Sequence, residues 1–321
     1  MRKRAQQRSL GYWFLGTMVI VWSLLSHRVL IAAPPSLYRI GVLTPGPGFN
    51  DAVAGLREGL AQLGYTEGSN LVFLLEDAQG DTRRLNHLIT RLLAAGPDLI
   101  CTFGSNTTMT AKQATTTLPI VFTFVAHPRR VGLIPSQASS QNNLTGIANH
   151  AGTLIGKRLE LLKMALPSEK RVLTLVVPRE SVSVMAQEEV AAIAPKLGVE
   201  LVRRDVSTRE DLMRVLDTLP TDGVDAMLYI PSSLVGSSME LLSQKAKELK
   251  LPLIGQNTSA VERGALLSYG ADFRRLGHQA ARLVFKILSG AKPSEIPIQS
   301  PEQLLLAVNL HTARTIGLPI P

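Results

Sequence analysis

The sequence predicts an α/β protein built from two lobes, each a mostly parallel β-sheet covered by helices. Short apolar runs alternate with segments of helical periodicity from residue 38 onward, and the alternation stops once near residue 148 and then restarts. Parallel neighbouring strands need crossover connections, which the intervening helices supply. The chain has 321 residues, 45% of them hydrophobic, which is enough for two domains with cores of their own.

The first lobe is predicted to begin at residue 37, and its boundary is expected near Ile147–His150. Its expected strands are Tyr38–Leu43, Leu71–Leu75, Leu99–Phe103 and Ile120–Val125, and its expected helices are Asp51–Leu63, Thr82–Ala95 and Met109–Thr115. Gly64 and Gly96 stand where the first two helices should end. The segment Val131–His150 is rich in Ser, Gln and Asn, so we expect an irregular connection between the lobes there.

The second lobe repeats the pattern. Its expected helices are Leu154–Ala165, Val184–Leu197, Arg209–Leu219 and Met239–Leu249, and its expected strands are Val172–Val177, Val199–Arg203, Asp225–Ile230, Leu251–Ile254 and Leu266–Gly270. Asp272 is predicted to cap an amphipathic helix, Phe273–Leu288, and Gln303–Leu310 is predicted to be a final strand. Periodicity alone does not decide to which lobe these last elements belong.

The first 33 residues have the composition of a secretory signal peptide. Several Arg and Lys residues precede the uncharged, mostly apolar run Leu10–Leu25, and Ala32-Ala33 offers small residues for cleavage. We therefore expect cleavage near Ala33 and a periplasmic or otherwise extracytoplasmic protein. The alternative is an uncleaved leader that anchors the chain to the inner membrane. No Cys lies near this site, which excludes a lipoprotein anchor, and the single Cys101 is expected in the core.

Charge and motifs exclude several function classes. The formal net charge is +9, but five cations lie before residue 34, where there are no acids, and no basic run follows, so we predict no nucleic-acid partner. There is no P-loop and no nucleophile elbow, and the GxG at Gly46 and Gly48 does not continue as a dinucleotide motif. The six His residues have no metal-ligand spacing. We predict a protein that is not an enzyme and that uses no cofactor or metal.

Polar side chains follow several predicted strands at their carboxyl ends, which is where open α/β sheets bind ligands. The candidate ligand-binding residues at these ends are Thr44, Asn50, Ser105, Asn106, His127, Tyr229, Ser232 and Asn257. Plain turns and helix caps are the alternative role for Asn50, Ser105 and Asn106, a surface loop for His127, and core packing for Tyr229. Two lobes with small polar groups at their strand ends favour a cleft that closes on a small molecule by hinge motion.

The chain resembles the substrate-binding proteins of ABC transporters, in particular the tryptophan- and tyrosine-type components with a type I periplasmic-binding-protein fold. The resemblance is carried by Arg39–Leu43, Gly104-Ser105, Ala111–Ala114, Pro119–Phe122, Gly132–Ile134, Asn143–Ile147, Ser268–Asp272 and the segment from Asn309 to Leu318. It implies three crossings between the lobes: a first lobe of residues 37–148 plus 271–300, and a second of 149–270 plus 301–321. It also implies a ligand contact at Tyr269.

The resemblance implies a solute receptor that hands an amino acid or another small carboxylate or aromatic compound to ABC permease subunits, and we expect it to work as a monomer. A membrane-tethered sensing module that regulates a partner protein is the alternative. The family usually has Asp-Pro-Val where this chain has His127-Pro128-Arg129. If His127 faces the cleft, a ligand without a free amine should therefore bind better than an amino acid.

Overall fold

The computed structural model describes residues 37–149, 151–219 and 223–319. The predicted signal peptide, residues 1–33, lies outside these ranges, so its cleavage or retention stays a prediction. Among the helices in the described ranges, none combines the length and the apolar character needed to cross a bilayer.

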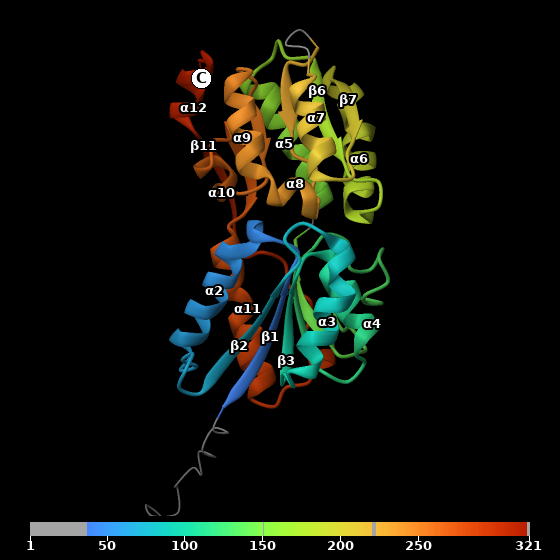
Figure 1. Cartoon of the computed structure of the whole chain (residues 1–321), viewed down its shortest axis with the longest axis vertical. Coiled ribbons are helices and arrows are strands. Elements are labelled where there is room, and N and C mark those ends of the chain that lie inside the picture. The colour runs from blue at the N-terminus through green and yellow to red at the C-terminus, as the bar shows by residue number, and fades with distance from the viewer. Residues whose placement is uncertain (1–36, 150, 220–222, 320–321) are drawn as a thin grey trace, which may run out of the picture. The chain divides into compact units, whose positions relative to one another are not determined.

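Two separate sheets organise residues 37–319, as the prediction of two α/β lobes requires (Figure 1). The first sheet has the order β2-β1-β3-β4-β5, and all of its strands are parallel. Its strands are β1 (Tyr38–Thr44), β2 (Leu71–Asp77), β3 (Leu99–Phe103), β4 (Ile120–Val125) and β5 (Leu144–Ala148). The helices around it are α2 (Asn50–Gln62), α3 (Leu85–Ala94), α4 (Ser105–Ala114) and α11 (Phe273–Leu288).

The second sheet has the order β11-β10-β9-β8-β6-β7, with β11 antiparallel to β10 and the other pairs parallel. Its strands are β6 (Arg171–Val176), β7 (Glu200–Asp205), β8 (Ala226–Leu228), β9 (Leu253–Gly255), β10 (Leu267–Ala271) and β11 (Leu304–Val308). Its helices are α5 (Ala151–Ala165), α6 (Ser181–Ile193), α7 (Arg209–Asp217), α8 (Ser233–Ser237), α9 (Met239–Glu248), α10 (Thr258–Glu262) and α12 (Leu310–Ile316).

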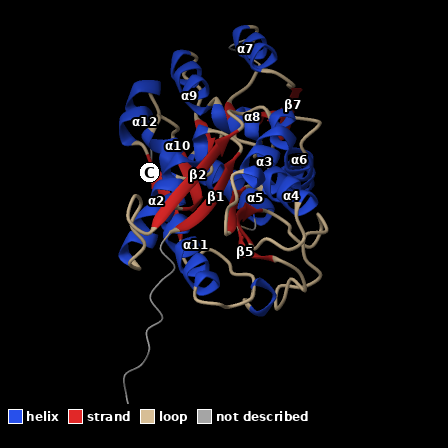
Figure 2. Cartoon of the chain, turned by 60° about the horizontal axis from the view of Figure 1, so that its bottom comes forward, coloured by secondary structure: helices blue, strands red, loops and turns tan. Residues whose placement is uncertain are grey.

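The core of the first lobe lies on both faces of its sheet, because alternate residues of a strand point to opposite faces. Ile40 and Val42 of β1 pack against α2 and α11, whereas Leu43 packs with Leu88 and Leu92 of α3. Figure 2 shows α2 and α11 on one side of β1 and β2, with α3 and α4 on the other. The strands carry long apolar runs since both faces are covered.

Helix α11 returns to the first lobe after the chain has traversed the second. It packs along α2, and Arg274 donates from Nε to Oε2 of Glu58 at 3.0 Å, across 216 residues of sequence. Asp272 caps the helix as predicted, accepting from the Arg275 N–H at 2.9 Å. The next strand, β11, pairs with β10 of the second sheet. The chain thus passes between the lobes near residues 149, 272 and 302.

The expectation of an irregular connection over Val131–His150 is wrong in its last part. Residues Leu144–Ala148 form β5, which pairs in parallel with β4. All five residues are buried, so the strand shows no alternation of apolar and polar residues, and its Gly146 resembles a turn residue in sequence. Helix α4 also begins at Ser105, four residues before the expected start. Its first four residues are all polar and so give no apolar periodicity, and the hydroxyls of Thr107 and Thr108 donate to the carbonyls of Phe103 and Gly104.

The close contact of α2 with α11 predicts a strong effect of one added methyl group. A Cβ at Gly277 would lie 2.1 Å from the Ala52 carbonyl oxygen, so Gly277→Ala must push the two helices apart. We expect a loss of about 2 kcal/mol or more in the free energy of unfolding, measured by urea denaturation. The exposed Lys286→Ala on the same helix is the control and should stay within about 0.5 kcal/mol of the wild type. Equal stabilities of the two variants would contradict this packing.

Candidate functional site

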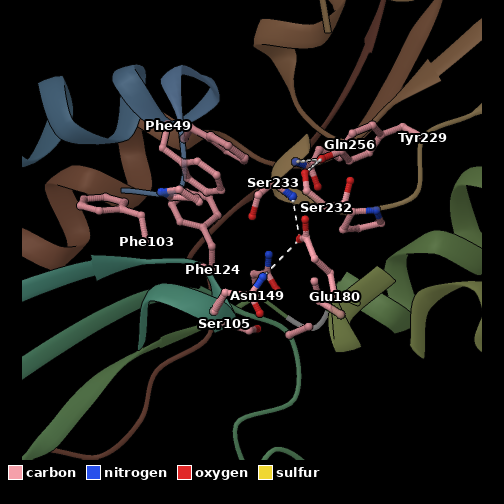
Figure 3. Close-up of a pocket in the computed structure, with 17 residues that line it drawn as sticks. Phe49, Phe103, Ser105, Phe124, Asn149, Glu180, Tyr229, Ser232, Ser233 and Gln256 are labelled. Atoms are coloured by element: carbon pink, nitrogen blue, oxygen red, sulfur yellow. Dashed lines mark hydrogen bonds between the residues drawn. The ribbon is translucent and has the colours of Figure 1, made fainter. Parts of the chain in front are cut away.

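A pocket lies where the carboxyl ends of both sheets meet (Figure 3). The first lobe lines it with the segments after β1, β3, β4 and β5 and with the start of α11, and the second lobe with the segments after β6, β8 and β9. The lining residues are Pro45, Phe49, Phe103, Gly104, Ser105, Asn106, Phe124, Ala126, Asn149, Glu180, Val182, Tyr229, Pro231, Ser232, Ser233, Gln256 and Phe273. The pocket therefore needs both lobes to be complete.

Four phenylalanine rings form the wall on the side of the first lobe. Phe49 lies within 5.1 to 6.4 Å, between ring centroids, of Phe103, Phe124 and Phe273, and it is stacked on Phe273 with an interplanar angle of 22°. Phe124 and Phe273 are 4.2 Å apart. The rings come from four separate segments, and each is held by contacts with the others, so the wall is preformed. It offers a large apolar surface to a ligand.

Phe124 is positioned by an irregularity of β4. Its φ of 60° lies in the left-handed region, which is costly for a bulky residue, and the pairing of β4 with β5 shifts register between Thr123 and Val125. Without this bulge the regular alternation of the strand would continue through Phe124. The bulge instead allows Phe124 to join the ring cluster at the pocket. Backbone strain of this kind is characteristic of ligand sites.

Glu180 stands on the opposite side of the pocket, just after β6, and its residue surface is only 1% exposed. Its Oε2 accepts from the Ser233 N–H at 2.8 Å and from Nδ2 of Asn106, in the other lobe, at 3.2 Å. Its Oε1 is buried and has no hydrogen-bond partner. Burial raises the pKa of this carboxyl, while the bond from the Ser233 backbone lowers it. The pocket thus contains a carboxylate oxygen with unused capacity to accept.

Further polar groups of the second lobe surround Glu180. The Tyr229 hydroxyl donates to the Ser232 carbonyl and accepts from Nε2 of Gln256. Both hydrogen bonds are long, with a donor–acceptor distance of 3.4 Å. Burial raises the pKa of Tyr229 to about 12, so its hydroxyl stays protonated. The Ser232 hydroxyl accepts from the Val235 N–H at the start of α8. Tyr229 and Gln256 therefore retain hydrogen-bonding capacity for a ligand.

The amino end of α4 borders the same pocket. Ser105 and Asn106 are its first two residues, and both line the pocket. The first backbone N–H groups of a helix have no partner within it and carry partial positive charge, so they favour a carboxylate. Gly104, with a φ of 95°, makes the turn from β3 into the helix. Backbone donors on one side and the Glu180 carboxylate on the other can accept a zwitterion.

Of the residues singled out from the sequence, the structure brings Ser105, Asn106, Tyr229 and Ser232 together in the pocket. Thr44 is buried at the end of β1 and Asn50 is exposed at the start of α2, and neither lines the pocket. Asn257 caps α10 and lines a smaller adjoining hollow.

Tyr269 and His127 also lie outside the lining. The carbonyl of Tyr269 accepts from Nε of Arg158 at 2.7 Å. His127 lies with its Nε2 2.8 Å from Oε1 of Glu189 and is not among the pocket residues. The predicted preference for ligands without an amine depended on His127 facing the cleft. His127 instead pairs with Glu189 outside the pocket, so the condition for that preference is not met. The carboxylate in the pocket is that of Glu180 instead.

Sequence reasoning did not single out the aromatic wall, Glu180 or Gln256. Glu180 and Gln256 stand in segments recognised as strand ends, but an acidic residue in a loop is most often at the surface. Phe273 directly follows the Asp272 cap, and Phe49 belongs to the first strand-end loop, so their place in the sequence was the available signal. Within the described ranges, no group of three or more His, Cys, Asp or Glu side chains could hold a metal ion.

Comparisons with known proteins agree with this geometry. A family model described as ABC transporter substrate binding protein matches residues 39–321. The chain is also 27% identical over 280 residues to a tyrosine-binding protein of Clostridioides difficile, covering 87% of this chain and 80% of the relative.

Two solved structures show the same two-lobed fold. One is an ABC domain from Streptococcus pneumoniae in complex with L-Trp, with a TM-score of 0.80, 25% identity, and coverage of 89% of this chain and 96% of that one. The other is the ligand-free, open structure of a substrate binding protein with adhesive properties from Clostridium difficile, with a TM-score of 0.63 at the same identity and coverage. The fold class predicted from the sequence, of type I periplasmic binding proteins, is confirmed.

The buried charge of Glu180 predicts a variant that is more stable than the wild type. Because burial raises the folded-state pKa of Glu180 above its unfolded value, its contribution to stability is lost as the pH rises through the folded pKa. Glu180→Gln keeps an acceptor for Ser233 and Asn106 but carries no charge. We expect the variant to be more stable by about 1 kcal/mol at pH 8, with a smaller difference at pH 4.5, in urea unfolding. The control Glu160→Gln should show no such trend, and a less stable Glu180→Gln at pH 8 would refute this reading.

Proposed function

Because this chain belongs to the ABC transporter substrate-binding protein family, we propose that it captures a small aromatic molecule carrying an ammonium group, such as an aromatic amino acid, between its lobes. The chain then delivers this solute to the membrane-spanning permease subunits of an ABC importer.

The observation that carries the proposal is the Glu180 carboxylate opposite the phenylalanine wall. Its Oε1 is buried without a partner, and Phe49, Phe103, Phe124 and Phe273 line the same pocket. A buried acceptor of this kind is costly unless a donor reaches it, and a charged donor such as an ammonium group makes a hydrogen bond to a carboxylate that is about twice as strong as a neutral one. An aromatic ring bonded to a short chain with an amine would satisfy both walls at once.

The relatives support an amino acid within this class. One curated relative is a tyrosine-binding protein, and one solved structure of similar fold contains L-Trp. In this chain the amino end of α4, at Ser105 and Asn106, is the place for an α-carboxylate, and the Glu180 carboxylate is the place for the α-ammonium. No Lys, Arg or His is among the pocket residues, so a carboxylate depends on uncharged donors, namely backbone N–H groups and side-chain hydroxyl and amide groups.

We propose that the two lobes move as separate domains, 37–148 plus 271–300 and 149–270 plus 301–321. The similarity to the L-Trp complex, with a TM-score of 0.80, exceeds that to the open ligand-free relative, with 0.63, although identity and coverage are the same. This supports a closed arrangement of the lobes in the present structure, which hinge motion at the three crossings would open. Both pocket walls come from one chain, so a monomer is sufficient. An importer's receptor works outside the cytoplasm, in agreement with the predicted export signal.

The central prediction is a requirement for the amine. In calorimetry with the full-length chain, L-tyrosine and tyramine should bind with micromolar affinity, and 3-(4-hydroxyphenyl)propionate, which lacks the amine, should bind at least about tenfold more weakly. Glu180→Gln should weaken the two amines about tenfold or more and leave the des-amino acid little changed. The reason is that only the amines interact with the Glu180 charge.

The matched control is Glu160→Gln, which removes a carboxylate from an exposed pair with Lys157 on α5, where neither residue lines the pocket. It should bind all three compounds as the wild type does. Equal binding of L-tyrosine and its des-amino analogue, or full affinity in Glu180→Gln, would contradict the proposed class of ligand.

A further inference from the structure

Outside the pocket, two ion pairs also join the lobes. Nε2 of His127 lies 2.8 Å from Oε1 of Glu189, and Nη2 of Arg130 lies 3.2 Å from Oε2 of Glu188. His127 and Arg130 follow β4 of the first lobe, whereas the two glutamates are adjacent on α6 of the second. None of the four lines the pocket. We call these four residues the rim cluster.

The first-lobe half of the rim cluster is held in a rigid turn. The Val131 N–H donates to the His127 carbonyl at 3.0 Å, and the Leu133 N–H donates to the Pro128 carbonyl at 2.8 Å. Lys112 of α4 reaches the turn with its Nζ, which donates to the carbonyls of Gly132 and Leu133. The turn therefore presents His127 and Arg130 in a fixed place relative to α4, whose amino end borders the pocket.

The second-lobe half is joined to the ligand pocket by a single helix. Glu180 immediately precedes α6, Val182 in its first turn lines the pocket, and Glu189 lies further along the same helix. Glu189 stands nine positions after Glu180, which corresponds to about 13 Å along the helix axis. A helix of this length moves as a unit, so bringing Glu180 to Asn106 of the first lobe also brings Glu189 to His127.

The two pairs of the rim cluster differ in burial. The side chains of His127 and Glu189 are 24% and 25% exposed, whereas those of Arg130 and Glu188 are 55% and 59% exposed. Exposed pairs contribute little because water screens them. The second oxygen of Glu189 is buried and has no hydrogen-bond partner. The contact with His127 at the first oxygen therefore compensates the partial burial of this carboxylate. Arg129 and Arg130 line a surface hollow with His127, and of the two arginines Arg130 is the one paired with an acid of α6, Glu188.

We propose that the His127–Glu189 pair determines ligand affinity without touching the ligand, because it stabilises the closed arrangement of the lobes. The proposal rests on the proposed function in that it takes the lobes to close around a solute. A contact that exists only in the closed form shifts the equilibrium between open and closed states by the same amount for every ligand. It therefore changes all affinities by one common factor, unlike a residue in the pocket.

The test is calorimetry with L-tyrosine, L-tryptophan and tyramine on the full-length wild type, on His127→Ala, on Glu189→Ala and on the double variant. Each single variant should weaken all three ligands by about fivefold or more, with their ratios unchanged. The double variant should be no weaker than either single variant, because the pair is already broken. Glu160→Ala, which breaks an ion pair within one lobe, should bind as the wild type does.

Single variants that bind within twofold of the wild type, or that change the ratios between ligands, would overturn the proposal. Circular dichroism and melting temperature show that each variant is folded, and Glu189→Gln is the milder replacement if Glu189→Ala is not. A wild type that binds none of the three compounds would count against the proposed ligand class and not against the rim cluster.

A second measurement tests the contact itself and needs no ligand. His127→Cys with Glu189→Cys should be joined by a short bifunctional thiol cross-linker, detected as a shift in electrophoretic mobility. The native Cys101 is buried and does not compete. His127→Cys with Lys196→Cys, which places the second thiol on the exposed segment after α6, should not be joined. Cross-linking of the first pair supports the rim contact in solution, and its absence both without ligand and with saturating L-tyrosine would overturn the proposal.

Discussion

The structure depends on one costly interaction, the burial of the Glu180 carboxylate where the lobes meet. A buried charge is tolerated only when hydrogen bonds compensate it, and here the donors come from opposite lobes: the Ser233 N–H from the second and the Asn106 amide from the first. One oxygen remains without a partner. The same carboxylate therefore links the lobes and keeps one oxygen without a partner, which is where the proposed ammonium group of the ligand would bind.

The first lobe supplies the apolar wall and the amino end of α4, and the second lobe supplies the Glu180 carboxylate and the polar groups around it. The four rings of the first lobe are held by a core that includes α11, a helix that follows the second lobe in the sequence. The strained backbone at Phe124 also holds them in place. Around Glu180, the second lobe presents Tyr229 and Gln256 with long hydrogen bonds that a ligand can improve. An apolar wall fixed by packing can select for ring size, while adaptable polar groups select for the charged end of the ligand. Each lobe alone lines only part of the pocket.

Much of the fold follows from the sequence because helices and strands are local. Periodicity located nearly all of the long elements, and the rule that ligands bind at strand ends located Ser105, Asn106, Tyr229 and Ser232. Sequence patterns failed where the position of a residue or strand is determined by contacts that are distant in the sequence. The strand β5 is buried throughout and does not alternate, Phe124 reaches the pocket only through a bulge, and Phe273 reaches it only because the chain crosses back to the first lobe. His127 stands at a strand end yet contacts α6 of the other lobe. No local sequence pattern encodes the position of that lobe, so this contact could not be predicted.

A binding constant of a two-lobed protein combines two quantities, the fit of the ligand to the pocket and the equilibrium between open and closed lobes. In the proposed mechanism, residues in the pocket set the differences between ligands, whereas contacts at the rim act on the equilibrium between open and closed lobes. In this chain the two sets occupy different parts of one helix, with Glu180 at the start of α6 and Glu189 further along it. Substitutions in the pocket can therefore alter which solute binds while the rim pairs keep the closed form accessible. A pocket that changes while the rest of the architecture stays the same is a physical reason for a two-lobed fold to serve many solutes.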